Sequence, residues 1–124
     1  VTDVTGFGLA GHLLEICRGS RLAAMVEFAR LPLIEEAVRH VKAGTFTGAS
    51  GRNWASYGSA VSPAPTFAQW QQKIVTDPQT SGGLLVACAP ESANEVLAAF
   101  SADGFDQAAV IGRFETGEPL VTVI

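Results

Sequence analysis

Residues 83–89, with the sequence GLLVACA, form a continuous apolar run of strand length. An apolar residue at every position, and not at every second one, is typical of a strand covered on both faces. Pro90 follows directly, and apolar residues then recur at helical spacing until Asp103-Gly104. We therefore expect a central strand over 84–88, flanked by a helix over 90–102.

Helices and strands also alternate on both sides of this run. The 124 residues suit a single domain over 1–124, and the order predicts an α/β (α+β) sandwich with a mixed sheet packed against helices. The last two strands are short and joined by five residues, which predicts a hairpin. The expected helices are 9–18, one opening at Leu31-Pro32, and 66–73, and the expected strands are 22–28, 108–114 and 120–124.

Residues 44–65 differ from the rest of the chain. They are rich in Gly, Ser, Ala, Thr and Pro and show no helical or strand periodicity. Such a segment buries little apolar surface to offset the entropy lost on ordering. We expect a long flexible loop over 44–65.

Composition excludes several classes of function. The net charge is −4 and the eight Lys and Arg are scattered, which argues against a nucleic-acid groove. The longest apolar stretch, 84–89, is too short for a membrane span. Cys17 and Cys88 each lie in an apolar pattern, which favours two reduced core thiols in a cytoplasmic protein over a disulfide. Charge and apolar length together predict no nucleic-acid or membrane partner.

The first candidate site is the segment TDVTGFG, residues 2–8, which runs directly into a helix. Glycines let a backbone approach a phosphate, and a helix N-terminus offers free N–H groups. Asp3 could hold a Mg²⁺ that also binds phosphate oxygens. The segment is neither a phosphate-binding Walker loop nor a dinucleotide fingerprint. A turn in which Thr5 caps the helix remains the alternative.

Two further segments contain polar residues of interest. The segment TDPQTSGG, residues 76–83, offers the hydroxyls of Thr80 and Ser81 to a ligand, or else is a tight turn entering a strand. Arg52 could pair with phosphate oxygens or could be a solvated loop residue. His12 and His40 lack the companions of a zinc site, so a structural or surface role is expected for both.

Two of these segments together resemble one known family. Residues 2–13, TDVTGFGLAGHL, are similar to one signature of selenophosphate synthetases, and residues 77–85, DPQTSGGLL, to a second. The two stand in the family's order, and Arg52-Asn53 with Tyr57-Gly58 resembles its intervening loop. The family belongs to the aminoimidazole-ribonucleotide synthetase-like superfamily. The resemblance implies the fold of the C-terminal domain of such enzymes.

The resemblance also implies an activity. The family converts selenide, ATP and water to selenophosphate, AMP and phosphate with Mg²⁺, and it acts as a two-domain homodimer. Asp3 matches a Mg²⁺-binding aspartate, and its neighbours in the phosphate pocket would be Thr2, Thr5, Gly6 and Gly8. The family's reactive cysteine and lysine lie near its N-terminus, so neither Cys17 nor Cys88 receives that role. No catalytic residue is assigned here.

We therefore expect an N-terminally truncated C-terminal domain that helps bind ATP and Mg²⁺ and is inactive alone, without its N-terminal domain. Two alternatives remain open at this point. One is a non-catalytic nucleotide-binding or dimerisation module, and the other is a different ATP-dependent enzyme of the same superfamily. The roles of residues 77–83 and of Arg52-Asn53 are also left open.

Overall fold

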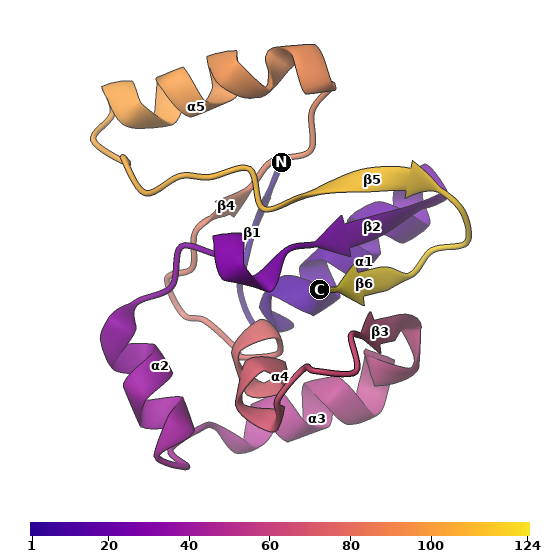
Figure 1. Ribbon diagram of the computed structural model, residues 1–124, viewed down its shortest axis with the longest axis vertical. Helices are drawn as coiled ribbons and strands as arrows, with labels where there is room; N and C mark the ends of the chain where they lie inside the picture. The colour runs from indigo at the N-terminus through magenta and orange to yellow at the C-terminus, as the bar shows by residue number, and fades with distance from the viewer.

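A computed structural model describes all residues, 1–124, and Figure 1 shows the arrangement of its elements. Short 3₁₀ turns occupy Phe28–Arg30, Gly58–Ala60 and Pro90–Ser92. The helices are α1 (Gly8–Ser20), α2 (Glu35–Lys42), α3 (Gly48–Tyr57), α4 (Gln69–Val75) and α5 (Ala93–Ala102). The strands are β1 (Thr2–Asp3), β2 (Leu22–Val26), β3 (Val61–Pro63), β4 (Leu84–Leu85), β5 (Gly112–Thr116) and β6 (Val121–Val123).

The main sheet has four strands in the order β3-β6-β2-β5. β2 runs parallel to β6 and antiparallel to β5, so the prediction of a mixed sheet packed with helices is confirmed. The predicted hairpin of the last two strands is wrong, because β2 lies between β5 and β6 (Figure 1). A direct β5–β6 pair would leave β2, whose Ala24 and Val26 are buried, with only one paired edge.

Helix α1 contributes much of the core. Its buried residues Ala10, Leu13, Leu14 and Cys17 follow helical spacing, and the helix packs against β2 and β6. The expected helix over 9–18 is therefore confirmed, and it extends one residue further at its start and two at its end. Arg21 ends it in the left-handed conformation, with φ of 55°, and its N–H donates to the Cys17 carbonyl.

The expected central strand over 84–88 is wrong. Only Leu84 and Leu85 are in a strand, and this β4 pairs with β1 alone in a separate two-stranded sheet. Leu85 is buried in the core, but Leu84 is 55% exposed. A continuous apolar run predicted burial on both faces of a strand. Here exposure alternates between Leu84 and Leu85, and residues 87–90 are exposed.

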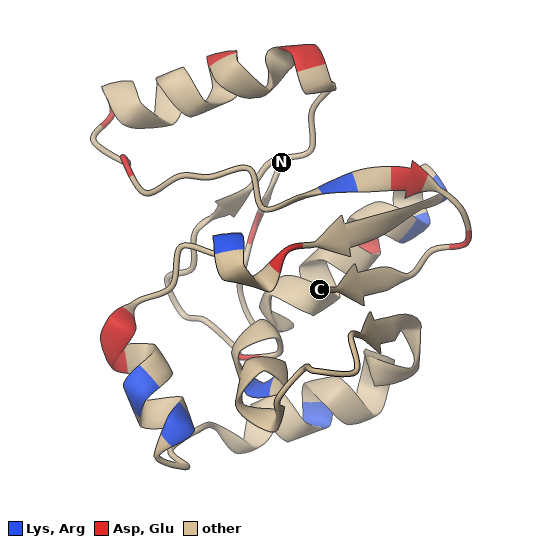
Figure 2. Ribbon diagram, in the orientation of Figure 1, with Lys and Arg blue, Asp and Glu red and all other residues tan.

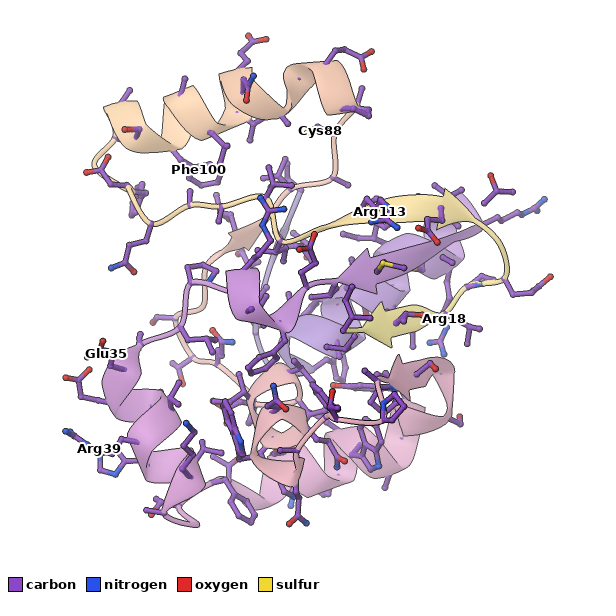
Figure 3. The ribbon with its side chains drawn as sticks, viewed as in Figure 1. Arg18, Glu35, Arg39, Cys88, Phe100 and Arg113 are labelled. Atoms are coloured by element: carbon purple, nitrogen blue, oxygen red, sulfur yellow. The ribbon has the colours of Figure 1, made fainter.

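The helix that follows β4 does not flank the main sheet. No residue of α5 is buried, and Figure 1 shows the helix apart from the sheet at the top of the view. In Figure 3, Phe100 lies on the side of α5 that faces the segment leading to β5, and its ring meets that of Phe105 edge-on at 6.4 Å. Cys88, just before this helix, is exposed, so only Cys17 is a core thiol as expected.

The expected long loop over 44–65 is also wrong, because the segment contains α3 and β3. Thr47 caps α3 by accepting a hydrogen bond from the Ser50 N–H at 3.3 Å. Ser50 and Tyr57 are the buried residues of this helix. Tyr57 and Val61 reach the hydrophobic core, but the other contacts of the segment are largely polar, so hydrophobic periodicity did not reveal it.

Charged residues are spread over the elements. Figure 2 shows Lys and Arg on several helices and on β5, with no single basic surface formed by one element. Helix α2 has Glu35 and Glu36 in its first turn and basic residues in its last, which matches the helix dipole. None of the helices is both long and apolar enough to cross a bilayer.

Candidate functional site

The structure brings the two sequence motifs together. β1 and β4 pair in antiparallel register, with Thr2 opposite Leu85 and Asp3 opposite Leu84. Beyond the strands the pairing continues, because the Val4 N–H donates to the Gly83 carbonyl at 2.9 Å and the Gln79 N–H donates to the Thr5 carbonyl at 3.1 Å. Segments about eighty positions apart in the sequence therefore form one local structure.

Two glycines are required by this close approach. A Cβ added at Gly82 would lie 1.8 Å from the Val4 carbonyl oxygen, so any side chain there would push the motifs apart. Gly8 has a positive φ of 70°, and a Cβ there would lie 2.7 Å from the Thr76 carbonyl carbon. The other two glycines, Gly6 and Gly83, have open space beside them, where a ligand can approach the backbone.

The third segment also reaches both motifs. The side-chain N–H groups of Asn53, on α3, donate to the Gly6 carbonyl at 2.9 Å and to the Thr76 carbonyl at 3.0 Å. Arg52 is exposed and makes no such contact. In the sequence, Arg52 was the candidate ligand-binding residue of this segment, whereas Asn53 makes the connection. No periodicity or spacing in the sequence indicates that role.

Tyr57, the last residue of α3, also contacts the first motif. Its hydroxyl donates to the Phe7 carbonyl. Burial raises the pKa of Tyr57 to about 12, so this hydroxyl keeps its proton across the physiological range. Together, Asn53 and Tyr57 fix the backbone of the first motif at two consecutive carbonyls, those of Gly6 and Phe7.

Asp3 is exposed on β1, and no ion pair or hydrogen bond engages its carboxylate. It does not cap α1, because Phe7 is the N-cap residue and no side chain caps that helix. Thr5 does not cap it either. The alternative reading of the motif, a turn in which Thr5 caps the helix, is therefore wrong, and the Asp3 carboxylate has no structural partner.

The Thr5 side chain instead meets His12. Thr5 Oγ1 lies 3.1 Å from His12 Nε2, and His12 Nδ1 lies 3.1 Å from Glu15 Oε2. The His12 side chain is 10% exposed. Of the two expected roles, structural or surface histidine, the structural one is therefore correct for His12. The spacing of His12 and Glu15, three residues apart on a helix, is the signal that could have indicated this pair.

The turn of the second motif begins at a buried polar cluster. Thr76 is fully buried, and its hydroxyl lies 2.6 Å from that of Ser50 and donates to the Gln72 carbonyl at 2.8 Å. Asp77 follows it and is half-buried, and burial raises the pKa of its carboxyl. Thr80 and Ser81, the expected donors, lie exposed on this turn.

The donor atoms of the site are oxygens. No cluster of three His, Cys, Asp or Glu side chains that could hold a metal forms within the chain. An exposed, unengaged carboxylate such as that of Asp3 nevertheless fits Mg²⁺, which binds one or two carboxylates and takes its remaining ligands from water and phosphate. The residues present therefore fit one contribution to a shared Mg²⁺ site.

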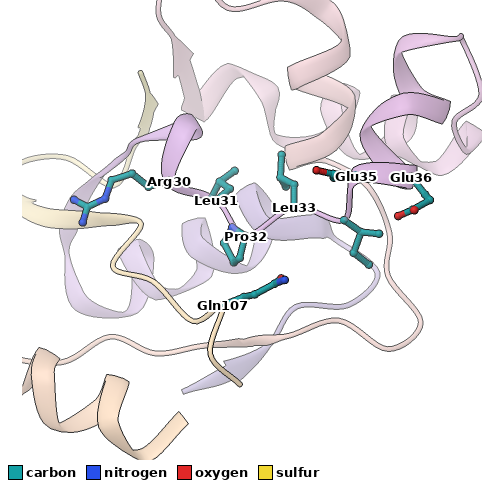
Figure 4. A pocket seen from close by; sticks show the side chains of 8 residues that line it. Arg30, Leu31, Pro32, Leu33, Glu35, Glu36 and Gln107 are labelled. Atoms are coloured by element: carbon teal, nitrogen blue, oxygen red, sulfur yellow. The ribbon is translucent and has the colours of Figure 1, made fainter. Parts of the chain in front are cut away.

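A surface pocket of about 590 Å³ lies elsewhere, and Figure 4 shows its lining. No residue of the three motif segments lines it. Its walls come from the segment before α2, the start of α2 and the segment after α5. They are Arg30, Leu31, Pro32, Leu33, Ile34, Glu35, Glu36 and Gln107.

Comparison with known proteins identifies the class. Residues 1–124 match the family described as AIR synthase related protein, C-terminal domain, and the chain belongs to this family. The resemblance drawn from the two motifs is confirmed at this level.

Within this family, the chain is similar to several proteins named selenide, water dikinase. The chain is 56% identical over 124 residues to the selenide, water dikinase of Dechloromonas aromatica (strain RCB), covering 100% of this chain and 36% of that protein. It is 57% identical over 123 residues to the enzyme of that name from Burkholderia orbicola (strain MC0-3), covering 99% and 35%. The match in Rhizobium meliloti (strain 1021) is 44% over 124 residues, covering 100% and 36%. The chain thus spans little more than a third of each relative's length.

Proposed function

We propose that this chain is part of a selenide, water dikinase, which makes selenophosphate, AMP and phosphate from selenide, ATP and water. The paired motifs would contribute to binding ATP and Mg²⁺. The observation that carries the proposal is the joining of β1 and β4, with an unengaged carboxylate at Asp3 on the edge of that pair. The identity of 56% over the whole chain to a protein of that name supports it.

Each motif residue has a defined part in this proposal. Asp3 would hold Mg²⁺, which when bound neutralises phosphate charge. Gly6 lies open beside the loop, so phosphate oxygens can approach its backbone. Thr2 and Thr5 would contribute hydroxyls to the pocket, and Gly8 would shape it indirectly by packing against Thr76.

Catalysis of this kind needs positioning more than covalent chemistry from the protein. Phosphoryl transfer is accelerated mainly by alignment and charge stabilisation, so loops and carboxylates from two domains can share one site. This chain supplies no nucleophile to the proposal. Cys17 is buried and burial raises the pKa of its thiol, which disfavours the thiolate, and Cys88 lies outside both motifs.

The proposal includes partners outside this chain. The relatives are nearly three times as long, and a further N-terminal domain would supply the reactive groups. A homodimer acting in the cytoplasm completes the proposal. The two cysteines are not paired with each other, as is usual for proteins of a reducing compartment.

The test is a product analysis. The complete polypeptide that carries this chain is incubated with ATP and Mg²⁺, with and without selenide, and AMP and selenophosphate are measured by chromatography and phosphorus NMR. We expect AMP that depends on selenide. ADP as the product, or AMP formation that ignores selenide, would contradict the proposed reaction.

The same assay tests the 124-residue chain alone. We expect neither AMP nor selenophosphate, because the chain provides one unengaged motif carboxylate and no reactive nucleophile. Selenide-dependent AMP from the purified chain would show that the catalytic groups are contained in it.

A further inference from the structure

Three side chains of the first motif and α1 form a continuous hydrogen-bonded row. Thr5 Oγ1, His12 Nε2 and Nδ1, and Glu15 Oε2 follow one another at 3.1 Å for each contact. The His12 side chain is 10% exposed and that of Glu15 is 55% exposed. The Phe7 ring lies 5.7 Å from the His12 ring. The row therefore runs from solvent, through a sheltered imidazole, to the loop beside Asp3.

The end at Glu15 sets the direction of the row. A carboxylate only accepts hydrogen bonds, so the proton shared with Glu15 belongs to His12 Nδ1. In a neutral imidazole the other nitrogen, Nε2, is then an acceptor. In that form of the ring, the Thr5 hydroxyl donates its single proton to Nε2.

This orientation determines what the Thr5 oxygen can bind. With its proton committed to His12, Oγ1 offers only lone pairs to a ligand. Lone pairs repel the oxygens of a phosphate but suit a hard cation or a water molecule bound to one. The chain stays paired with the second motif beyond β1, through the hydrogen bonds of Val4 and Thr5. Asp3 is exposed, Val4 is buried and Thr5 is half-buried, as in an extended chain whose alternate residues, Asp3 and Thr5, share one face.

We propose that His12 and Glu15 are positioning residues that turn the Thr5 hydroxyl so that its oxygen, together with the Asp3 carboxylate, faces the cation side of bound Mg·ATP. The inference rests on the proposed function. It changes the role of Thr5 from a wall of the phosphate pocket to a ligand of the cation or of its water shell.

The first arm of the test measures the tautomer of His12. The complete polypeptide is labelled with ¹⁵N-histidine, and two-bond proton–nitrogen NMR correlations are recorded without ligand. We expect His12 to carry its proton on Nδ1, and Glu15→Ala to reduce that population. Glu95→Ala, at an exposed position on α5, is the matched control and leaves the tautomer unchanged. A proton on Nε2 in the unaltered protein would overturn the inference.

The second arm measures ATP binding by calorimetry over a range of Mg²⁺ concentrations. Thr5→Val removes the hydroxyl but keeps the shape of the side chain. We expect this change to raise, by about threefold to tenfold, the Mg²⁺ concentration at which the enhancement of ATP binding is half-maximal. Binding of ATP without Mg²⁺ should not change. Thr5→Ser restores the hydroxyl and should return the Mg²⁺ response close to that of the unaltered protein.

The outcomes separate the possible failures. A loss of Mg²⁺-free ATP binding in Thr5→Val would place Thr5 on the phosphates and overturn the inference, as would an unchanged Mg²⁺ response. An unaltered protein that binds no Mg·ATP would contradict the proposed function and the cation-facing role together. The tautomer would in that case still decide whether His12 and Glu15 orient the Thr5 hydroxyl.

Discussion

Single residues, and not extended surfaces, join the parts of the candidate site. Asn53 reaches two carbonyls of different motifs, and Tyr57 reaches a third carbonyl. The sequence predicted that Asp3, Thr5 and Gly6 belong to one motif, and the structure adds that Asp77 begins the turn of the second. Asn53 could not be predicted, because its role depends on where α3 lies and not on its neighbours in the chain.

Asp77 gives a prediction about pH. Burial raises the pKa of its carboxyl above the ordinary value of 3.8, so the folded protein favours the protonated form. The resulting stabilisation is present at pH values below the unfolded pKa and is lost as pH rises through the raised folded pKa. Asp77→Asn removes the buried charge, so we expect it to raise the melting temperature at pH 7 and to lose this advantage in acid.

The measurement is thermal unfolding of both proteins between pH 3 and pH 7. Asp103→Asn, at an exposed position after α5, is the control for the general effect of removing one negative charge. A melting temperature at pH 7 that falls in Asp77→Asn would show that the ionised carboxylate stabilises the fold instead.

At the scale of elements, the site depends on the antiparallel pair of β1 and β4. Each strand has only two residues, so their pairing relies on the contacts that continue beyond them. The Val4–Gly83 hydrogen bond and the close packing of Gly82 provide those contacts. A substitution that increases the distance between β1 and β4 should therefore separate the two motifs.

Gly82→Ala tests this dependence, with Gly83→Ala as its neighbour control. A Cβ at Gly82 would meet a backbone oxygen at 1.8 Å, so we expect a loss of about 1–3 kcal/mol in the free energy of unfolding. Gly83 has no atom within 4 Å of the added Cβ, so its substitution should change stability by less than about 0.5 kcal/mol. Urea unfolding measures both, and equal losses would contradict the close approach.

Elements differ in how far the sequence predicted them. α1 followed from hydrophobic spacing, because it buries an apolar face against the core. α3 was missed because Gly, Ser and Asn form its polar contacts and give no apolar stripe. The order of the main sheet was missed because a five-residue connector fits a hairpin equally well, and only the pairing of β2 on both edges excludes it.

At the scale of the whole molecule, α5 differs from α1, the helix that packs on the sheet. It buries no residue, whereas α1 buries seven. Figure 1 shows α5 standing apart from the four-stranded sheet. The apolar spacing of residues 93–102 predicted the helix correctly but could not show whether another element covers it.

We expect the amides of α5 to exchange hydrogen at least about tenfold faster than those of α1 in the 124-residue chain. Local opening costs little free energy where few apolar contacts must break. Hydrogen exchange followed by mass spectrometry measures both helices in one experiment. Equal protection of α5 and α1 would show that α5 unfolds only together with the core.

We propose that the joined motifs place Asp3 for Mg²⁺ and not for folding. Asp3→Asn keeps the size of the side chain and removes its charge. In the complete polypeptide we expect turnover to fall on the order of a hundredfold, because a metal ion supplies several kcal/mol of charge stabilisation to phosphoryl transfer. The melting temperature should stay almost unchanged, since the carboxylate is exposed and makes no contact. Measuring both on one preparation decides the matter, and near-normal turnover with a lowered melting temperature would contradict the claim.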